Sequence, residues 1–515
     1  MNQRKCGAIL SYLLLAVKNC TFLLFIPILV SWLGKEQFGL YNIIGSFMSS
    51  MLILDMGLSN SVVRFVAKYR ARKDTIKEEA FLSTIMTTYL LFALIALIVG
   101  ILLYQFIPAI FKHSLSISEI KQIQEMFVLL IINVCLTLVF NPYRGVLAAY
   151  ERYIVLKTIE ISQQLLRVLL IIILIMVHKS ILSVVIADTL CNIAVIALRV
   201  FYANKLGRQI KYSYIDLSIL KEVFVYSVFI AMNLIATELY WRTNNIVLGI
   251  MTSSSLVAVY GLGAQFSMYY SQFSYSLSQV TTSKIVMLVE KGADGKVLTD
   301  ELIKTGRIQL MIISVIFLSY LFYGKKFIKL WVGPGFEESY LIGLFVMMPM
   351  SILLIQNLGI TILEAKRLHW FRSITMFVMS IINIIVTIFL VKIMGIIGAA
   401  IATSIGLIIG NIIMLNIFYH KVIKLNMVRY YREVGKGILL AMAGASICVF
   451  IGKLILGNPD TWPNLILQIA IFCIVYCILL LAVGINKYER NTISGMLKNK
   501  GMPFSAYSKR IDSAI

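Results

Sequence analysis

Residues 11–30 of the chain read SYLLLAVKNCTFLLFIPILV, with Lys18 and Asn19 near the middle of an apolar run. A helix of about 20 apolar residues crosses the hydrocarbon core of a bilayer. A lysine at the centre of such a helix costs roughly 2.5–3.5 kcal/mol on insertion scales, so intramembrane cations usually face a cavity or a partner group. The stretch therefore predicts a membrane helix that carries a cation on a protected face.

The composition of the whole chain is that of a membrane protein. Of its 515 residues, 60% are hydrophobic and 14% are charged, whereas soluble domains are about 45–50% apolar and about 25% charged. Apolar runs recur along nearly the whole chain, and no long soluble domain interrupts them. We therefore expect an all-α polytopic membrane protein.

Fourteen runs are long and apolar enough to cross a membrane. An even number of spans places both termini on one side. The predicted spans are residues 7–30, 39–62, 80–107, 122–143, 155–177, 180–202, 222–249, 254–283, 304–323, 338–363, 371–391, 394–418, 435–456 and 463–485.

The net charge of +23 would suggest nucleic-acid binding in a soluble protein, but here the positions of the cations explain it. Of 47 Lys and Arg residues, 35 lie at the termini and on alternate connections, 9 on the opposite connections and 3 within spans. Cytoplasmic loops carry such an excess of Lys and Arg. We therefore expect both termini in the cytoplasm and no nucleic-acid partner.

Weak sequence matches recur at an offset of about 215 residues. The Leu-Gly pair at 33–34 matches the pair at 248–249, and SILSVVIADTL from Ser180 matches GIIGAAIATSI from Gly395. The offset covers six spans, so both copies keep one orientation, as in the parallel repeats of some transporters. The predicted parts are an N-lobe of six helices (1–215), a pseudo-symmetric C-lobe of six (216–425), helices 13 and 14 (426–486) and a cytoplasmic tail (487–515).

Polar residues inside the spans are the first candidates for function. Lys18, Arg167 and Arg242 are the cations there, and the first and seventh spans, which are equivalent in the repeat, each carry one. A cavity between the lobes lined by these cations would attract an anion, and phosphate suits it because Arg binds phosphate oxygens bidentately. The candidate polar residues of the same cavity are Asn19, Gln163, Glu238, Asn244 and Asn245.

The acidic residues leave a second interpretation open. Glu238 precedes Arg242 by four residues and Glu160 precedes Arg167 by seven, so each pair shares one helix face. These ions would then simply neutralise one another between helices.

Four charged residues are candidates for gating or ion coupling, and Asp55 near Arg64 is equally a local salt bridge or a helix cap. The four are Asp55, Arg64, Glu160 and Asp188. The seven cysteines are scattered and the four histidines fall at segment ends, which gives no zinc pattern. We expect no metal ion and no cofactor.

Four motifs carry a family resemblance that covers essentially the whole chain. They are LGKEQFGLY (33–41), LDMGLSNSVVRF (54–65), GVLAAYER (145–152) and GIIGAAIATSIG (395–406). With them the chain resembles the polysaccharide-transporter branch, which includes the O-antigen flippases, of the multidrug/oligosaccharidyl-lipid/polysaccharide (MOP) exporter superfamily.

The resemblance implies two six-helix lobes around a central cavity, with two further carboxy-terminal helices. It implies a flippase of the bacterial cytoplasmic membrane that moves undecaprenyl-pyrophosphate-linked oligosaccharide outward by alternating access, for surface polysaccharide synthesis. Lys18, Arg167 and Arg242 would bind the pyrophosphate. The sequence TNNIVLG from Thr243 has asparagines where relatives often have an acid, which argues against ion coupling at that point.

The expected partners are the lipid-linked oligosaccharide and membrane lipids, with a polysaccharide polymerase and glycosyltransferases as further candidates. Two other functions stay open. A multidrug cation antiporter of the same superfamily would need net acidic cavity residues. A membrane polysaccharide polymerase would need catalytic residues in large extramembrane loops, and the longest outward connections are only about fourteen residues. We therefore expect no enzyme.

Overall fold

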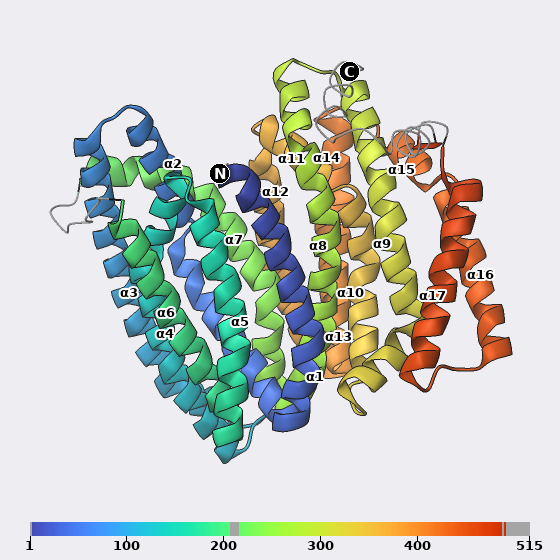
Figure 1. Ribbon diagram of the computed structural model, residues 1–515, viewed down its shortest axis with the longest axis horizontal. Helices are drawn as coiled ribbons and strands as arrows, with labels where there is room; N and C mark the ends of the chain where they lie inside the picture. Colours follow the sequence, from blue (N-terminus) through green and yellow to red (C-terminus); the bar gives the residue numbers. More distant parts are fainter. Residues whose placement is uncertain (1–2, 207–215, 487–488, 491–515) are drawn as a thin grey trace.

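The computed structural model describes residues 3–206, 216–486 and 489–490, and every regular element in these ranges is helical. The helices run side by side across the molecule (Figure 1). They are α1 (Gln3–Met51), η1 (Leu52–Asp55), α2 (Leu58–Ala71), α3 (Thr75–Phe111), α4 (Ile117–Ala149), α5 (Tyr153–Val177), α6 (Ile181–Asn204), α7 (Leu217–Met251), α8 (Ser254–Glu290), α9 (Gly295–Val332), α10 (Glu338–Ile355), α11 (Leu358–Ala365), α12 (His369–Met394), α13 (Ile396–Gly406), η2 (Leu407–Met414), α14 (Leu415–Lys421), α15 (Met427–Gly435), α16 (Ile438–Leu456), α17 (Trp462–Leu479) and η3 (Leu480–Gly484).

The all-α membrane fold is confirmed. Within the described residues, eleven helical segments are long and apolar enough to cross a membrane. The segment 9–71 counts once among them although α1 breaks inside it, and α7 and α8 are not among the eleven. The predicted number of fourteen spans therefore stays a prediction.

Gly34 interrupts helix α1 and divides it into a first arm (residues 3–33) and a second arm (residues 35–51). Gly34 has φ 81° and ψ 171°, a conformation that glycine adopts without steric cost. The interruption falls in the predicted gap between spans 7–30 and 39–62. The end predicted for the second span is wrong, since the helix stops at Met51 and the chain passes through η1 and two left-handed residues, Met56 and Gly57, before α2.

Two further spans are also broken. The predicted span 338–363 forms α10 and α11, and the span 394–418 forms α13, the π-helix η2 and α14. The two breaks face each other, because the side-chain amide of Gln356 donates to the carbonyl of Asn411 in η2 at 2.9 Å. A π-helical turn frees backbone groups from the regular ladder, so hydropathy alone does not reveal these breaks.

The same pattern of helix packing recurs in two groups of helices, the N-half (α1–α6) and the C-half (α7–α14). In the N-half α1 packs on α5, α3 on α4, and α4 on α6; in the C-half α7 packs on α12, α9 on α10, and α10 on α13. Figure 1 shows α3–α6 on one side, α8–α14 on the other and α1 and α7 between them. The pattern fits the sequence repeat, while the lobe boundaries stay predictions. The tail 487–515 lies outside the described residues except for Glu489 and Arg490.

Helix α1 connects the two halves through both of its arms. In the first arm Phe22 stacks on Tyr269 of α8 at 4.2 Å between ring centroids, and Trp331 of α9 donates to the carbonyl of Leu23 at 2.7 Å. In the second arm Gly39 lies against the first turn of α8. The halves therefore meet through aromatic contacts near one part of α1 and through close backbone approach near the other.

The contact at Gly39 gives a direct test of this packing. A Cβ atom at position 39 would lie 1.8 Å from the carbonyl oxygen of Ser254, whereas a Cβ at Gly45 in the same arm meets nothing within 4 Å. Overpacking a close contact costs about 1–3 kcal/mol. We expect Gly39→Ala to lower the thermal unfolding temperature of the purified protein and Gly45→Ala to leave it unchanged or raise it. Equal temperatures for the two variants would contradict the packing.

Candidate functional site

Lys18 lies on the packed face of the first arm of α1. It follows Leu14 by four residues and precedes Phe22 by four and Phe25 by seven, so all four share one side of the helix. The three apolar residues are 4–6% exposed, yet Lys18 is exposed. Since Phe22 contacts α8 and α9 on this side, the exposure of Lys18 indicates accessible space between α1 and its partner helices.

The surroundings of Lys18 contain unused polar capacity. Among the described residues, Lys18 forms neither an ion pair nor a hydrogen bond. The next residue, Asn19, is half-buried and its side-chain oxygen is buried without a hydrogen-bond donor. Buried polar atoms are satisfied in most native structures, and an unsatisfied one calls for an explanation such as a ligand. Lys18 and Asn19 together therefore offer a donor and an acceptor to a bound molecule.

Arg167 and Asp188 form an ion pair in the N-half. Arg167 Nε of α5 lies 2.5 Å from Asp188 Oδ1 of α6, and Arg167 Nη2 donates to the hydroxyl of Tyr41 in α1 at 2.7 Å. The Tyr41 hydroxyl donates in turn to Asp188 Oδ2 at 3.1 Å. The charge of Arg167 is therefore already balanced by Asp188 within the protein. Its predicted contact with pyrophosphate stays a prediction.

Glu160 and Arg167 share one face of α5 but pair with other residues, and Arg144 of α4 and Asp188 of α6 supply neutralisation between helices. Glu160 lies 2.7 Å from Lys157 Nζ and 3.5 Å from Arg144 Nη2, while Arg167 is held by Asp188. Gln163 lies between Glu160 and Arg167 on the same face of α5 and is half-buried. Glu160 thus pairs both within α5, through Lys157, and with α4, through Arg144, and only the second contact depends on a neighbouring helix.

Arg242 and Glu238 form a loose pair on α7. Arg242 Nε is 3.9 Å from Glu238 Oε2, which is buried and accepts no hydrogen bond. Both lie on the face of α7 that also carries Asn245 and Gly249, at spacings of three to seven residues. That face contacts the second arm of α1, since Asn245 donates to Ser46 at 3.0 Å. Arg242 therefore faces the N-half and keeps guanidinium donors available.

The two asparagines of TNNIVLG have different roles. Asn244 is 1% exposed, donates to Tyr260 and to Thr403 at 2.8 Å each, and accepts from Thr387 at 3.3 Å. All these partners lie in the C-half, so Asn244 does not match the prediction that it lines a polar cavity. Asn245 faces α1 instead, and its side-chain oxygen is buried without a donor.

Asp55 is surrounded by neutral donors. Its Oδ1 accepts from the hydroxyl of Tyr89 at 2.5 Å, from Asn141 at 2.7 Å and from Ser59 at 3.1 Å. Within the part of the chain that the structure describes, Asp55 forms no ion pair. Arg64 is exposed, with its guanidinium 5.9 Å from the centre of the Phe65 ring.

A small cavity adjoins the Asp55 group. It has a volume of about 250 Å³ and its lining includes Ser59, Arg144, Lys157 and Glu160. Ser59 also bonds Asp55, so of the predicted gating residues Glu160 lines the cavity and Asp55 lies behind one of its lining residues. It lies within the N-half, between α2, α4 and α5.

Sequence reasoning missed the neutral partners of the ionic groups. Tyr41, Tyr89 and Asn141 each bond a carboxylate from another helix. The available signal was the carboxylate itself, because a charge within an apolar helix needs donors from its neighbours. Among residues 3–206, 216–486 and 489–490, no group of three His, Cys, Asp or Glu side chains is placed to hold a metal ion.

The sequence of residues 7–282 matches the family model described as polysaccharide biosynthesis protein. The chain belongs to this family. A search of curated proteins gives no match. The resemblance to the polysaccharide-transporter branch of the MOP superfamily, first seen in the motifs, is therefore confirmed at the level of the family.

Solved structures with the same fold come from the same superfamily. The lipid II flippase MurJ in an inward closed conformation is 16% identical, with a TM-score of 0.69 over 95% of this chain and 99% of that one. An inward-facing multidrug resistance MATE family transporter is 12% identical, with a TM-score of 0.64 over 79% and 93% of the chains. A MOP superfamily transporter from Pyrococcus furiosus is 14% identical, with a TM-score of 0.53 over 84% and 97%. These similarities show a MOP-type transporter fold.

The ion pair of Arg167 and Asp188 gives a testable coupling. Breaking a buried pair costs about 3–5 kcal/mol, and these side chains are 23% and 26% exposed, so we expect about 2 kcal/mol for Asp188→Ala. The exchange Arg167→Asp with Asp188→Arg should recover part of the loss, and Tyr41→Phe should cost about 1 kcal/mol. Unfolding of the purified variants measures these values. Additive single losses, with no recovery in the exchange, would contradict the pair.

Proposed function

We propose that this protein is a flippase that moves undecaprenyl-pyrophosphate-linked oligosaccharide across the bacterial cytoplasmic membrane by alternating access. The observation that supports this most is the exposure of Lys18 on the packed face of α1, beside an unsatisfied oxygen of Asn19. An intramembrane cation without a counterion is favoured only where water or an anionic ligand reaches it.

The residues between the halves suit a pyrophosphate joined to sugars. Lys18 supplies a point charge, and Arg242 supplies donors in a planar fork that fits phosphate oxygens. Arg167 offers a cation already balanced by Asp188, so it would contribute hydrogen bonds rather than net charge. Asn19, Gln163 and Asn245 would serve the sugar hydroxyl groups, since an amide both donates and accepts.

The membrane potential can drive such a transport step. A lipid pyrophosphate with roughly two negative charges gains about 2.3 kcal/mol per charge per 100 mV when it leaves an inside-negative cell. This direction requires the termini to lie in the cytoplasm, as the excess of Lys and Arg indicates. Figure 1 places the start of α1 and the end of α17 at the same end of the molecule, which fits that orientation.

Alternating access would follow from movement of the predicted lobes (1–215 and 216–425) around α1, with helices 13 and 14 (426–486) at the side. Asp55 lies at the break between α1 and α2, where a change of its hydrogen bonds would alter the path of the chain. Glu160 and Asp188 would join it as gating residues, because each pairs with a cation of another helix. Arg64, nine residues after Asp55 on α2, would be the fourth.

A multidrug cation antiporter is the second candidate. It is favoured by Asp55, whose carboxylate has neutral partners and would suit a bound cation. A polymerase is less well supported. The connections 112–116 and 333–337 are five residues each, which leaves no room there for a folded catalytic region, so we propose no enzymatic activity. A polymerase and glycosyltransferases would instead be partners that use or supply the glycan.

Substitution of Lys18 tests the proposal. We expect Lys18→Gln to lower the rate of export about tenfold or more, and Lys18→Gln with Arg242→Gln to abolish it, because a hydrogen bond to a charged group contributes about 1.5–3 kcal/mol. Lys18→Arg should retain export. The measurement is the share of completed lipid-linked glycan that remains in the inner leaflet.

Thermal unfolding of the same variants separates binding from stability. Loss of an unpaired cation should leave the unfolding temperature of Lys18→Gln unchanged or higher. Normal export in the double variant would refute the flippase. If the double variant changes the length of the polysaccharide but leaves export intact, the polymerase is favoured. If cells with the double variant lose resistance to drugs, the antiporter is favoured.

A further inference from the structure

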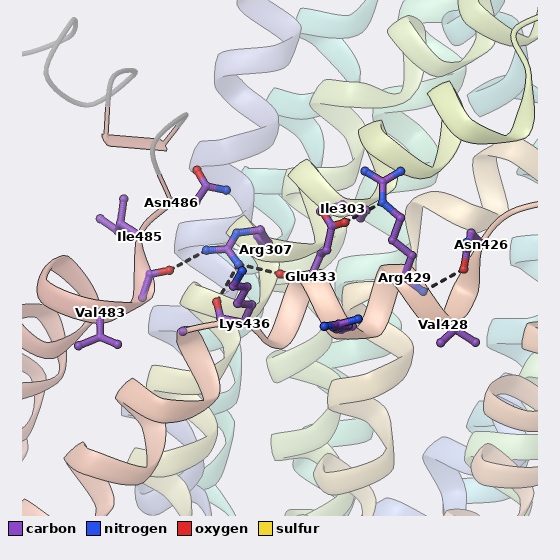
Figure 2. A pocket seen from close by; sticks show the side chains of 13 residues that line it. Ile303, Arg307, Asn426, Val428, Arg429, Glu433, Lys436, Val483, Ile485 and Asn486 are labelled. Carbon is purple, nitrogen blue, oxygen red and sulfur yellow. Dashed lines mark hydrogen bonds and ion pairs between the residues drawn. The ribbon is translucent and has the colours of Figure 1, made fainter.

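A cationic cavity lies beside α15, near the end of α17. It is separate from the ionic groups near α1, which are Lys18, Arg167 and Arg242. Its volume is about 1110 Å³, and it is lined by α9, by α15 and by the chain that follows α17 (Figure 2). Four cations and one carboxylate belong to its lining; these are Arg307, Arg429, Arg432, Lys436 and Glu433.

Two of these cations already have carboxylate partners within the protein. Arg307 is 3% exposed, pairs with Glu489 at 2.6 Å and donates to the carbonyl of Gly484 at 2.6 Å. Arg429 lies 2.8 Å from Asp300 and 2.6 Å from Glu433. Figure 2 shows Arg307 directed toward the chain around Ile485 and Arg429 above α15. These contacts hold the walls of the cavity together.

The other two cations remain available. Arg432 and Lys436 are exposed, and within the described residues neither forms an ion pair or a side-chain hydrogen bond. Arg432 lies in the last turn of α15 and Lys436 follows the end of the helix, and both line the cavity. The cavity therefore presents two uncompensated positive charges.

An apolar groove of about 480 Å³ lies on the other side of α15. Its lining is apolar except for a few hydroxyl groups, and it includes Leu310, Phe317, Met348, Ile352, Leu439 and Met442. Met348 is 65% exposed and Leu439 is 58% exposed, so the groove is open at its side. In a membrane protein such an opening faces the acyl chains of the bilayer.

The cavity and the groove adjoin each other along α9. Ile303 and Arg307 of α9 line the cavity, and Leu310, Ser314 and Phe317 line the groove; their spacing of three and four residues places all five on one face of α9. Helix α15 lies between the two hollows and lines each of them with an opposite side.

Residues 432 and 433 of α15 line the cavity, and residues 431 and 434 line the groove. At the junction with α16, Gly437 has φ +79° and a Cβ atom there would lie 2.3 Å from the carbonyl oxygen of Val483. The close approach of the α17 end thus shapes the boundary between the two parts.

We propose that this site binds an anionic phospholipid, with its phosphate on Arg432 and Lys436 and one acyl chain in the groove beside α9 and α16. The charge selects an anionic headgroup, and the groove selects a molecule with an apolar chain. Basic pockets between membrane helices on the cytoplasmic side are known to take anionic headgroups.

The position argues for a phospholipid rather than the transported substrate. The lining comes from α8–α10, α15, α16 and the end of α17, and none of it comes from the N-half. Figure 1 shows α15–α17 at the side of the molecule farthest from α3–α6. The site therefore stands apart from the path between the halves, and a resident lipid there would connect α16 and α17 to α9.

Lipid binding to the purified full chain tests this proposal. The probes are dioleoyl phosphatidylglycerol and dioleoyl phosphatidylcholine, which have the same chains and differ in charge, titrated onto delipidated protein and counted by native mass spectrometry. We expect phosphatidylglycerol to bind more tightly. Arg432→Gln with Lys436→Gln should raise its concentration at half occupation roughly thirtyfold without changing phosphatidylcholine binding.

Two controls separate the parts of the site. Arg367→Gln with Lys421→Gln removes two exposed cations that line neither hollow and should leave both lipids unaffected. Leu439→Trp fills the groove and should weaken both lipids. The proposal is overturned if the wild type does not prefer phosphatidylglycerol, if the Arg432 and Lys436 double variant keeps the preference, or if undecaprenyl phosphate displaces phosphatidylglycerol at equal concentration. Because binding alone is measured, failure here leaves the flippase proposal intact.

Discussion

A charge inside a hydrocarbon layer must be paired, hydrogen-bonded or wetted, and this constraint organises the interior of the protein. Arg167 meets it through Asp188 and Tyr41. Asp55 meets it through Tyr89 and Asn141. These contacts join helices that are distant in sequence, so the same groups that avoid a desolvation cost also fix how the helices pack.

Lys18 meets the constraint in another way. Leu14, Phe22 and Phe25 on the same helix face are buried, and Phe22 contacts α8 and α9, yet Lys18 is exposed. In the proposed flippase, access to water or to an anion takes the place of pairing. Arg242, 3.9 Å from a carboxylate oxygen that accepts no hydrogen bond, is an intermediate case. The partly satisfied groups lie on faces directed at the other half, which is where a carrier must open.

The sequence was sufficient to predict the fold class, but it was insufficient to predict which side chains pair between helices. Hydropathy located the helices, and the motifs located the family, because both depend on composition and local order. The pairing of Arg167 with Asp188 depends on an adjacent helix. The burial of Asn244 against Tyr260 and Thr403 does so too. Helix α15 was missed because its nine residues are too few for a span, although Met427, Tyr430 and Val434 have amphipathic spacing.

The accessibility of position 18 tests the central claim most directly. Two single-cysteine proteins are compared, one with Lys18→Cys and one with the natural Cys20, each lacking all other cysteines. Cys20 lies on the opposite side of α1 with the exposed Leu13 and Leu24. We expect a charged, membrane-impermeant thiol reagent to modify position 18 at least tenfold faster than Cys20, and undecaprenyl pyrophosphate to slow the reaction at position 18. Equal and slow modification of both positions, with no effect of the lipid pyrophosphate, would show that Lys18 faces hydrocarbon and would contradict the account.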